Sequence, residues 1–200
     1  MKDKKSLSIV GANIKGNREI NDFYPTPIYA TDSLLKREVF GDNILEPACG
    51  DGAISKILEK QGCTVKSQDL IYRGYGFGNI DFLTFKPVEQ YDAVITNPPY
   101  KYGLEFVKKA LSCVKEGGKV AMLLKLVFLE SATRYKFFIE NPPSRIYVFS
   151  KRLKIYKKGI ILKNSGLIAY AWFIWEKNNK KLPIVDWIND KEDIKQEKLI

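Results

Sequence analysis

The chain has 200 residues, and its 45% hydrophobic and 12% aromatic fractions indicate one globular domain with a sizeable core and exclude a disordered chain. A net charge of +10 favours a polyanionic partner, most simply nucleic acid, although a lysine-rich composition also arises without one. Zero histidines and three widely spaced cysteines predict no metal site and no histidine base. Because no apolar run approaches the roughly 20 residues of a membrane span, we expect a cytoplasmic protein without a membrane partner.

The beginning of the chain is polar and then aromatic. Residues 1–20 are predicted to form a flexible basic arm. The sequence Asn-Asp-Phe-Tyr-Pro-Thr-Pro at 21–27 follows and places an aromatic pair before a helical pattern at 27–40. Thr26 is a good N-cap and Pro27 a good first helical residue, so we expect the helix to begin there.

A glycine-rich turn follows the first predicted strand, at 42–49. The sequence Glu-Pro-Ala-Cys-Gly-Asp-Gly-Ala at 46–53 leads from this strand into a helix that ends near residue 61. A Gly-x-Gly turn between strand and helix lets the main chain approach a ligand closely. The third glycine of the dinucleotide fingerprint is absent, and the acidic Glu46 suits a cationic or hydroxyl-bearing ligand better than phosphates.

One acidic residue lies at the end of the next predicted strand, at 63–70, and another lies shortly after it. Asp69 closes this strand 19 residues after Gly50, which fits an acidic residue that binds ribose hydroxyls. Asp81 lies in a short apolar stretch at 79–83.

The sequence Asn-Pro-Pro-Tyr at 97–100 ends a buried strand predicted at 91–96. Consecutive prolines cannot continue a central strand, so the chain leaves the sheet at its carboxyl edge, where α/β proteins bind ligands. Asn97 offers a donor and an acceptor, Pro98 leaves a carbonyl group outside the ladder, and Tyr100 offers a flat ring. This combination suits a planar group that carries an –NH2. The alternative is a plain strand terminator with a surface Asn and Tyr.

The rest of the chain alternates between helices and strands. Helices are predicted at 103–114 and 131–139, and strands at 119–128, 146–149 and 167–175. The alternation predicts a doubly wound, mostly parallel α/β sheet whose last two strands form an antiparallel edge hairpin. The domain is expected at 21–177, and the tail at 178–200 reads as a solvated helix or a fraying end. The second Asn-Pro-Pro, at 141–143, is interpreted as structural.

The loop at 151–166 carries six basic residues and no acidic residue. Such a loop is a candidate for holding a phosphate backbone, or alternatively it keeps an edge strand soluble. The predicted nucleic-acid-binding residues are Lys151, Arg152, Lys154, Lys157 and Lys158.

The aromatic segment, the glycine turn, Asp69 and the Asn-Pro-Pro-Tyr motif together resemble the class I S-adenosylmethionine-dependent amino-methyltransferases. The segment at 22–27 is similar to that of N6-adenine DNA methyltransferases, including Dam-like enzymes of phages. The resemblance covers residues 22–177 and implies a Rossmann-like methyltransferase fold with a seven-stranded sheet and S-adenosyl-L-methionine as cofactor. It also implies transfer to the exocyclic N6 of adenine in nucleic acid, DNA in preference to RNA. Typical restriction–modification enzymes add a target-recognition region, for which 200 residues leave little room.

The resemblance also implies residue roles. The turn at 50–52 would lie under the methionine part of the cofactor, and the segment at 23–26 would close over that end. Asp69 would bind the ribose hydroxyls, and Asp81 the adenine amino group. The implied cofactor residues are Phe23, Tyr24, Pro25, Thr26, Glu46, Pro47, Ala48, Gly50, Gly52, Asp69, Leu70, Asp81 and Phe82. The implied catalytic residues are Asn97, Pro98, Pro99 and Tyr100.

The implied mechanism needs no histidine. The Asn97 side-chain oxygen and the Pro98 carbonyl would accept hydrogen bonds from the –NH2 group and aim its nitrogen at the methyl donor, while a flipped base stacks on Tyr100. Two alternatives stay open. One is an rRNA or tRNA adenine N6-methyltransferase. The other is a glutamine N5-methyltransferase of release factors, which shares Asn-Pro-Pro-Tyr but usually carries a helical N-terminal domain. The sequence leaves the target sequence and the oligomeric state open.

Overall fold

The computed structural model describes residues 23–88, 90–153, 155 and 168–189. Its strands are β1 (Asn43–Glu46), β2 (Thr64–Ser67), β3 (Tyr91–Thr96), β4 (Val114–Lys125), β5 (Arg145–Phe149), β6 (Tyr170–Glu176) and β7 (Ile184–Ile188). Its helices are α1 (Ile28–Leu35), α2 (Ser55–Lys60), α3 (Gly103–Cys113) and α4 (Ala132–Glu140), with 3₁₀ helices at Tyr100–Tyr102 and Leu126–Leu129. None of the helices in this described part is long and apolar enough to cross a bilayer.

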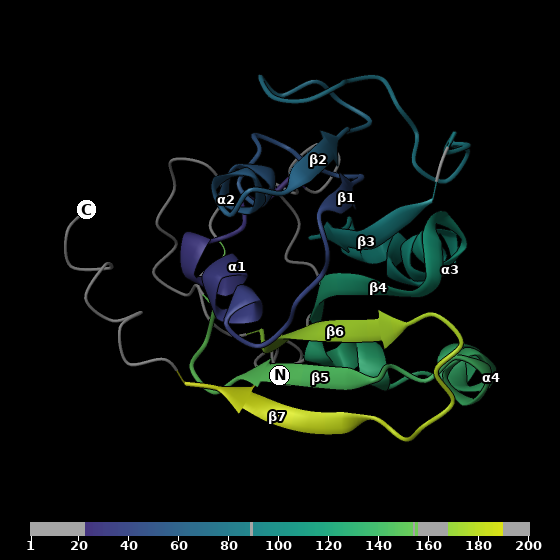
Figure 1. Ribbon diagram of the computed structural model, residues 1–200. Coiled ribbons are helices and arrows are strands. Elements are labelled where there is room, and N and C mark those ends of the chain that lie inside the picture. The colour runs from purple at the N-terminus through teal and green to yellow at the C-terminus, as the bar shows by residue number, and fades with distance from the viewer. Residues whose placement is uncertain (1–22, 89, 154, 156–167, 190–200) are drawn as a thin grey trace, which may run out of the picture.

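The strands form one sheet in the order β2-β1-β3-β4-β6-β5-β7 (Figure 1). The first four are parallel, β6 lies antiparallel between β4 and β5, and β7 pairs parallel with β5. The prediction of a doubly wound, mostly parallel, seven-stranded α/β sheet is therefore confirmed, as is the antiparallel pairing of the strands that flank the basic loop.

The outermost strand at this end of the sheet differs from the prediction. The edge is β7, which comes from the tail that was expected to be a solvated helix or a fraying end, and that expectation is wrong for Ile184–Ile188. Four of the five residues are β-branched or aromatic, which favours a strand, and Asp186 is the exception. The run was overlooked because it lies between charged stretches of a tail with no net charge. Four of its five residues are exposed, as suits an edge.

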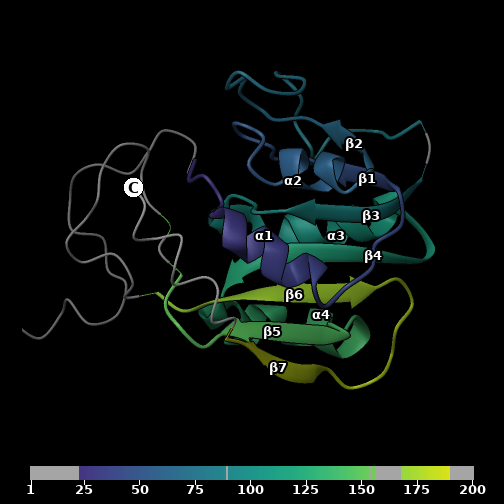
Figure 2. The ribbon, with the colours of Figure 1, turned by 60° about the vertical axis from the view of Figure 1, so that its left-hand side comes forward.

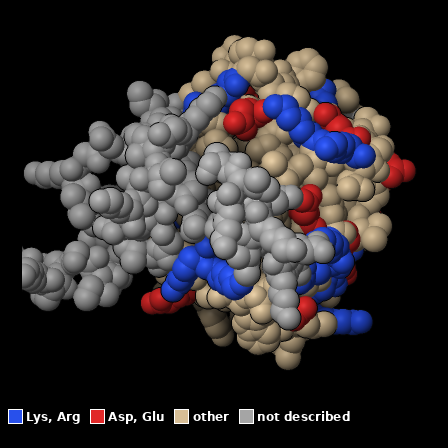
Figure 3. All heavy atoms as spheres, turned by 90° about the vertical axis from the view of Figure 1, so that its left-hand side faces the viewer, with Lys and Arg blue, Asp and Glu red and all other residues tan. Residues whose placement is uncertain are grey.

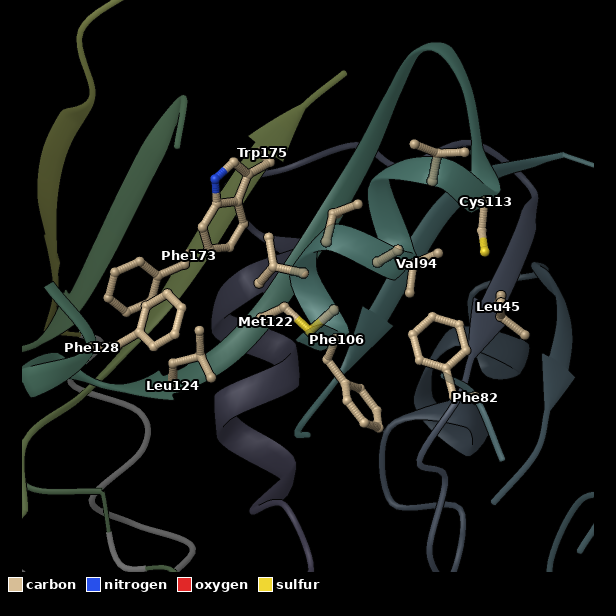
Figure 4. Close-up of a cluster of buried hydrophobic side chains, with 14 of the residues drawn as sticks. Leu45, Phe82, Val94, Phe106, Cys113, Met122, Leu124, Phe128, Phe173 and Trp175 are labelled. Atoms are coloured by element: carbon tan, nitrogen blue, oxygen red, sulfur yellow. The ribbon is translucent and has the colours of Figure 1, made fainter. Parts of the chain in front are cut away.

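Helices cover both faces of the sheet, with α1 and α2 on one side and α3 and α4 on the other (Figure 2). Two apolar clusters fill the layers. The cluster beneath α3 and α4 joins Phe106 to Val94, Met122, Phe173 and Trp175 (Figure 4). Because both faces of the sheet are covered there, residues 120–124 of β4 and 170–175 of β6 read as continuous apolar runs without alternation, whereas residues 115–119 of β4 are Lys, Glu and Gly.

Helix α1 is shorter than predicted and begins differently. It ends at Leu35, and Pro27 occupies the N-cap position without a side-chain cap bond. The Thr26 hydroxyl, which was expected to cap this helix, accepts a hydrogen bond from Asn97 instead. Trp172 on β6 donates to the Ala30 carbonyl over 2.8 Å and so ties α1 to the sheet.

A buried carboxylate connects β4 and β5 at the amino edge of the sheet. The Glu38 side chain is 3% exposed and accepts from Lys119 over 2.6 Å, from the Tyr147 hydroxyl over 2.8 Å and from the Arg145 guanidinium. Burial alone would raise the pKa of Glu38, but the hydrogen bonds from Arg145, Lys119 and Tyr147 outweigh it and lower that pKa below its usual 4.5.

Replacing Glu38 should therefore destabilise the fold. Glu38→Ala leaves two cations without their shared partner, so we expect the free energy of unfolding to fall by about 3 kcal/mol near neutral pH. Urea unfolding followed by circular dichroism measures it. The control is Glu140→Ala, which removes only an exposed pair with Lys136 and should change stability by less than ~0.5 kcal/mol.

The effect also has a defined pH dependence. The unfolded carboxyl binds a proton near pH 4.5 and the folded one only at lower pH, so the Glu38 contribution is complete above that value. It is lost as the pH falls through the folded pKa. The difference between wild type and Glu38→Ala should shrink in acid, and a difference that stays constant below about pH 4 would contradict this account.

Candidate functional site

A pocket of about 490 Å³ lies at the carboxyl ends of β1, β2 and β3. Parallel strands end together, so the segments after each of them converge there. Figure 3 views the molecule from this side, where basic and acidic side chains lie around uncharged surface. All of the residues that the resemblance assigned to the cofactor line the pocket except Gly50 and Gly52. Of the four implied catalytic residues, Asn97 and Pro99 line it, and Pro98 and Tyr100 do not.

The glycine turn supports aromatic rings. Gly50 and Gly52 have φ values of +56° and +82°. A Cβ atom on Gly50 would overlap the Phe23 ring, and one on Gly52 would lie 2.5 Å from Tyr75. The Arg73 guanidinium lies 4.3 Å from the centre of the Phe23 ring, so a cation, a ring and a glycine are stacked at the pocket wall. In this structure the rings of Phe23 and Tyr75 cover the Cα atoms of the two glycines. Direct contact between these glycines and a ligand therefore stays a prediction.

Asp69 fixes the shape of the turn. Its two carboxylate oxygens accept from the main-chain N–H groups of Gly50 and Ile71, each over 2.9 Å. The role predicted for it, binding ribose hydroxyls, remains a prediction, and carboxylate oxygens have further lone pairs for that purpose. Asp69 therefore connects the end of β2 to the turn after β1.

Glu46 holds the corner between β1 and α2. The side chain is buried and accepts from the Ser55 N–H over 2.8 Å and from the Ser55 hydroxyl, which also contacts Ser67. Burial raises the pKa of Glu46 well above its usual value, and Asp69 adds to the rise, although the Ser55 hydrogen bonds oppose it. A positive charge in the pocket would favour the ionised form.

The far wall is apolar with one carboxylate. Phe82 is buried and packs against Phe106 with ring centres 5.1 Å apart. Asp81 is exposed, and its Oδ1 accepts from the Leu83 N–H over 2.9 Å. A flat apolar group with a polar edge would fit between these side chains.

Asn97 has one satisfied and one unsatisfied end. Its Nδ2 donates to the Tyr24 carbonyl over 3.3 Å and to the Thr26 hydroxyl over 3.1 Å. A carbonyl can only accept, so this contact fixes which end of the amide is nitrogen. The Asn97 Oδ1 is buried and has no hydrogen-bond partner within the described residues. A buried acceptor without a donor is costly, and such an atom indicates a place for a donor from a ligand.

Tyr100 lies beside this amide but is half-buried in the protein. Its ring centre is 5.7 Å from that of Tyr170, and the Lys125 ammonium is 4.9 Å from it. Burial raises the pKa of Tyr170. The Tyr100 ring packs against Tyr170 and Lys125 in this structure. Stacking of a flipped base on Tyr100 therefore remains a prediction.

Several pocket residues were not identified from the sequence. They are Cys49, Asp51, Ala53, Arg73, Ile80, Leu83, Lys101, Tyr102 and Phe106. Lys101, Tyr102 and Phe106 follow the Asn-Pro-Pro-Tyr motif within two turns, so proximity in sequence was a usable signal. Arg73 had none, because its contact with Phe23 spans 50 residues of chain. Burial raises the pKa of the Cys49 thiol to about 12, so it is not a reactive thiolate.

The basic loop is described only in part. Lys151 and Arg152 are exposed. Lys154, Lys157 and Lys158 lie outside the described residues, so their predicted role stays a prediction. Within the described ranges, no group of three or more Cys, Asp or Glu side chains could hold a metal ion.

No protein-family model and no curated protein sequence matches the chain. Solved structures do match it. A putative class I S-adenosylmethionine-dependent methyltransferase from Listeria monocytogenes has a TM-score of 0.60 and 15% identity, over 92% of this chain and 72% of that one. A modification subunit of a putative type I restriction enzyme from Vibrio vulnificus YJ016 has a TM-score of 0.56 and 15% identity, over 85% of this chain and 48% of its own. A putative RNA methyltransferase from Pyrococcus horikoshii has a TM-score of 0.59 and 15% identity, over 82% and 91%.

These likenesses show the fold. The chain has the Rossmann-like fold of the class I S-adenosylmethionine-dependent methyltransferases. It spans about half the length of the restriction-enzyme subunit.

The stacking of Phe23 on Gly50 predicts a steric effect. Gly50→Ala forces a side chain into the ring and also strains a positive φ, so we expect a loss of about 2–4 kcal/mol of unfolding free energy. The control is Gly62→Ala. Gly62 has a φ of +94°, and no atom of the described residues lies within 4 Å of an added Cβ, so this variant should lose only the backbone part, about 1 kcal/mol. Chemical unfolding of both variants measures the difference. Equal losses would show that Phe23 does not pack on Gly50.

Proposed function

We propose that this protein is an S-adenosylmethionine-dependent methyltransferase that transfers a methyl group to the exocyclic N6 of adenine in nucleic acid, with DNA as the first candidate. The observation that carries this proposal is the Oδ1 of Asn97 at the pocket wall, which is buried and has no hydrogen-bond partner among the residues that the structure describes. The methyltransferase fold supports it, and so does the position of the pocket at the carboxyl edge of the sheet.

The residues of the pocket fit the proposed cofactor. Its volume is within the range that binds ligands of this size. S-adenosylmethionine carries a sulfonium, an ammonium, a ribose diol and an adenine. Asp51 and Asp69 would bind the ammonium and the diol, and the Asp51 Oδ1 is buried without a partner among the described residues. Asp81 and Phe82 would hold the adenine. When bound, the cofactor supplies an electrophilic methyl group.

The protein's own contribution is to orient the acceptor nitrogen. The Tyr24 carbonyl and the Thr26 hydroxyl hold the Asn97 amide so that its oxygen is the atom left to accept from an –NH2 group. Pro98 does not line the pocket here, so its carbonyl as a second acceptor remains a prediction. If it accepts, both N–H bonds of the amino group would be fixed and the lone pair directed away from them. Alignment of this kind lowers the barrier without a base, in agreement with a chain that has no histidine. The bond from the nitrogen to the methyl group would form as the methyl–sulfur bond breaks, and the methylated nitrogen would then lose one proton to solvent.

Nucleic acid is favoured over protein as the substrate. The net charge of +10 attracts phosphates, and solved structures with this fold include proteins named for restriction–modification and for RNA methylation. The side-chain amide of a glutamine would donate to the Asn97 oxygen equally well, but the net charge of +10 gives no advantage in binding a substrate without phosphates. RNA and release factors are therefore comparison substrates in the experiments.

Replacing Asn97 should affect methyl transfer but not cofactor binding. Asn97→Ala should lower methyl transfer at least ~10²-fold, because it removes a preorganised acceptor, and leave cofactor affinity nearly unchanged. Radiolabel transfer and calorimetry measure the two effects. The second Asn-Pro-Pro provides a matched control, since Asn141→Ala should transfer at the wild-type rate. Near-wild-type transfer by Asn97→Ala would refute the mechanism.

Asp69 predicts an effect on the cofactor instead. Asp69→Ala should weaken S-adenosylmethionine binding by about 1.5–3 kcal/mol, since it removes a charged acceptor and loosens the Gly50 turn. Asp186→Ala on β7, at the other edge of the sheet, should bind as wild type. Isothermal calorimetry compares them. Unchanged affinity in Asp69→Ala would remove this residue from the cofactor site.

A further inference from the structure

The connection between β2 and β3 exposes aromatic rings beside the pocket. It extends beyond β2 at one end of the sheet (Figure 1). Residues 70–79 of this connection read Leu-Ile-Tyr-Arg-Gly-Tyr-Gly-Phe-Gly-Asn. Tyr72 and Phe77 are each 61% exposed, although rings of this size are usually mostly covered. We call residues 70–79 the aromatic loop.

The aromatic loop is held in place by its main chain. The Phe77 N–H donates to the Ser67 carbonyl over 2.9 Å, and the Phe77 carbonyl accepts from the Asp69 N–H over 2.8 Å. These bonds pair the loop with the end of β2 and do not involve the Phe77 ring. The ring is therefore displayed on a fixed backbone, and its exposure does not result from a loose segment.

Cations lie beside the rings of the loop. Lys66 is 5.4 Å from the centre of the Phe77 ring, and Lys56 is 4.9 Å from that of Tyr75. The nearby acid Glu59 accepts from the Tyr75 hydroxyl over 2.5 Å. Alternating flat rings and positive charges are what single-stranded nucleic acid requires, because bases stack on rings while phosphates pair with cations.

The aromatic loop also borders the pocket. Leu70 and Arg73 line the pocket, and Tyr72 lies between them in the chain. A strand whose target base enters the pocket would therefore place its neighbouring nucleotides next to this loop.

We propose that the aromatic loop binds the single-stranded nucleotides that flank the target base, with Tyr72 and Phe77 as stacking platforms and Lys56 and Lys66 as phosphate contacts. The proposal rests on the proposed function and deepens it, because it names a strand out of its duplex as the form that the site accepts. Stacking is tolerant of sequence, so the loop would provide grip without base specificity.

The test measures binding of a labelled single-stranded DNA of about 20 nucleotides by fluorescence anisotropy, with the full chain. Tyr72→Ala and Phe77→Ala should each weaken binding about tenfold, and the double variant more. Tyr72→Phe and Phe77→Tyr keep the rings and should bind as wild type. Tyr135→Ala removes a ring of similar exposure, 68%, from α4 on the other side of the molecule, and should have no effect.

Salt and strand state test the rest of the proposal. Lys66→Gln should reduce the slope of log affinity against log salt by roughly 0.7, the value for one phosphate contact with a single strand. The single strand should bind more tightly than the same sequence as a duplex, and an RNA single strand should show the same loss in the ring variants if stacking alone holds it. Equal binding of single strand and duplex, or an unchanged slope, would contradict the proposal.

The outcomes for the loop and for the proposed function are separable. Wild-type binding by the Tyr72→Ala/Phe77→Ala double variant, with unchanged thermal unfolding, overturns the loop proposal even if methyl transfer to adenine continues. Conversely, a protein that methylates no nucleic acid but loses oligonucleotide binding in the double variant retains the loop surface and loses the proposed function.

Discussion

The side-chain amide of Asn97 is the point on which the site depends. Its nitrogen donates to the Tyr24 carbonyl and the Thr26 hydroxyl, and its oxygen is left without a partner in the described structure. Two segments far apart in sequence must meet to produce this state. The two prolines after Asn97 end β3, and Pro25 and Pro27 stiffen the segment that crosses it, so neither side can easily relax.

The position of that segment is set deep in the fold. Trp172 is fully buried in β6 and donates to the Ala30 carbonyl, which fixes α1 against the sheet. The residues before α1 are thereby held over the ends of the parallel strands. Phe23 then packs on Gly50, and Arg73 packs on Phe23. The pocket wall is thus a continuation of the core. We therefore expect a change in the packing of β6 to shift the Asn97 amide.

Much of this arrangement could be predicted from the sequence, because it follows local rules. Prolines end strands, a Gly-x-Gly turn joins a strand to a helix, and parallel strands end at one edge, so the segments that border the pocket could be named in advance. Strand β7 was missed because its short run of β-branched and aromatic residues lies between charged stretches of the tail. The stacking of Phe23 on Gly50 and the packing of Tyr100 against Tyr170 and Lys125 are tertiary contacts, and no spacing in the chain announces them.

The most direct test of the central claim is the identity of the methylated atom. The protein is incubated with labelled S-adenosylmethionine and, separately, with DNA, total RNA and a release factor, and each product is digested and analysed by mass spectrometry. The account predicts N6-methyladenine as the labelled product. It expects this product from DNA in preference to RNA. Label on glutamine, on a carbon or oxygen atom, or on no substrate at all would contradict the account.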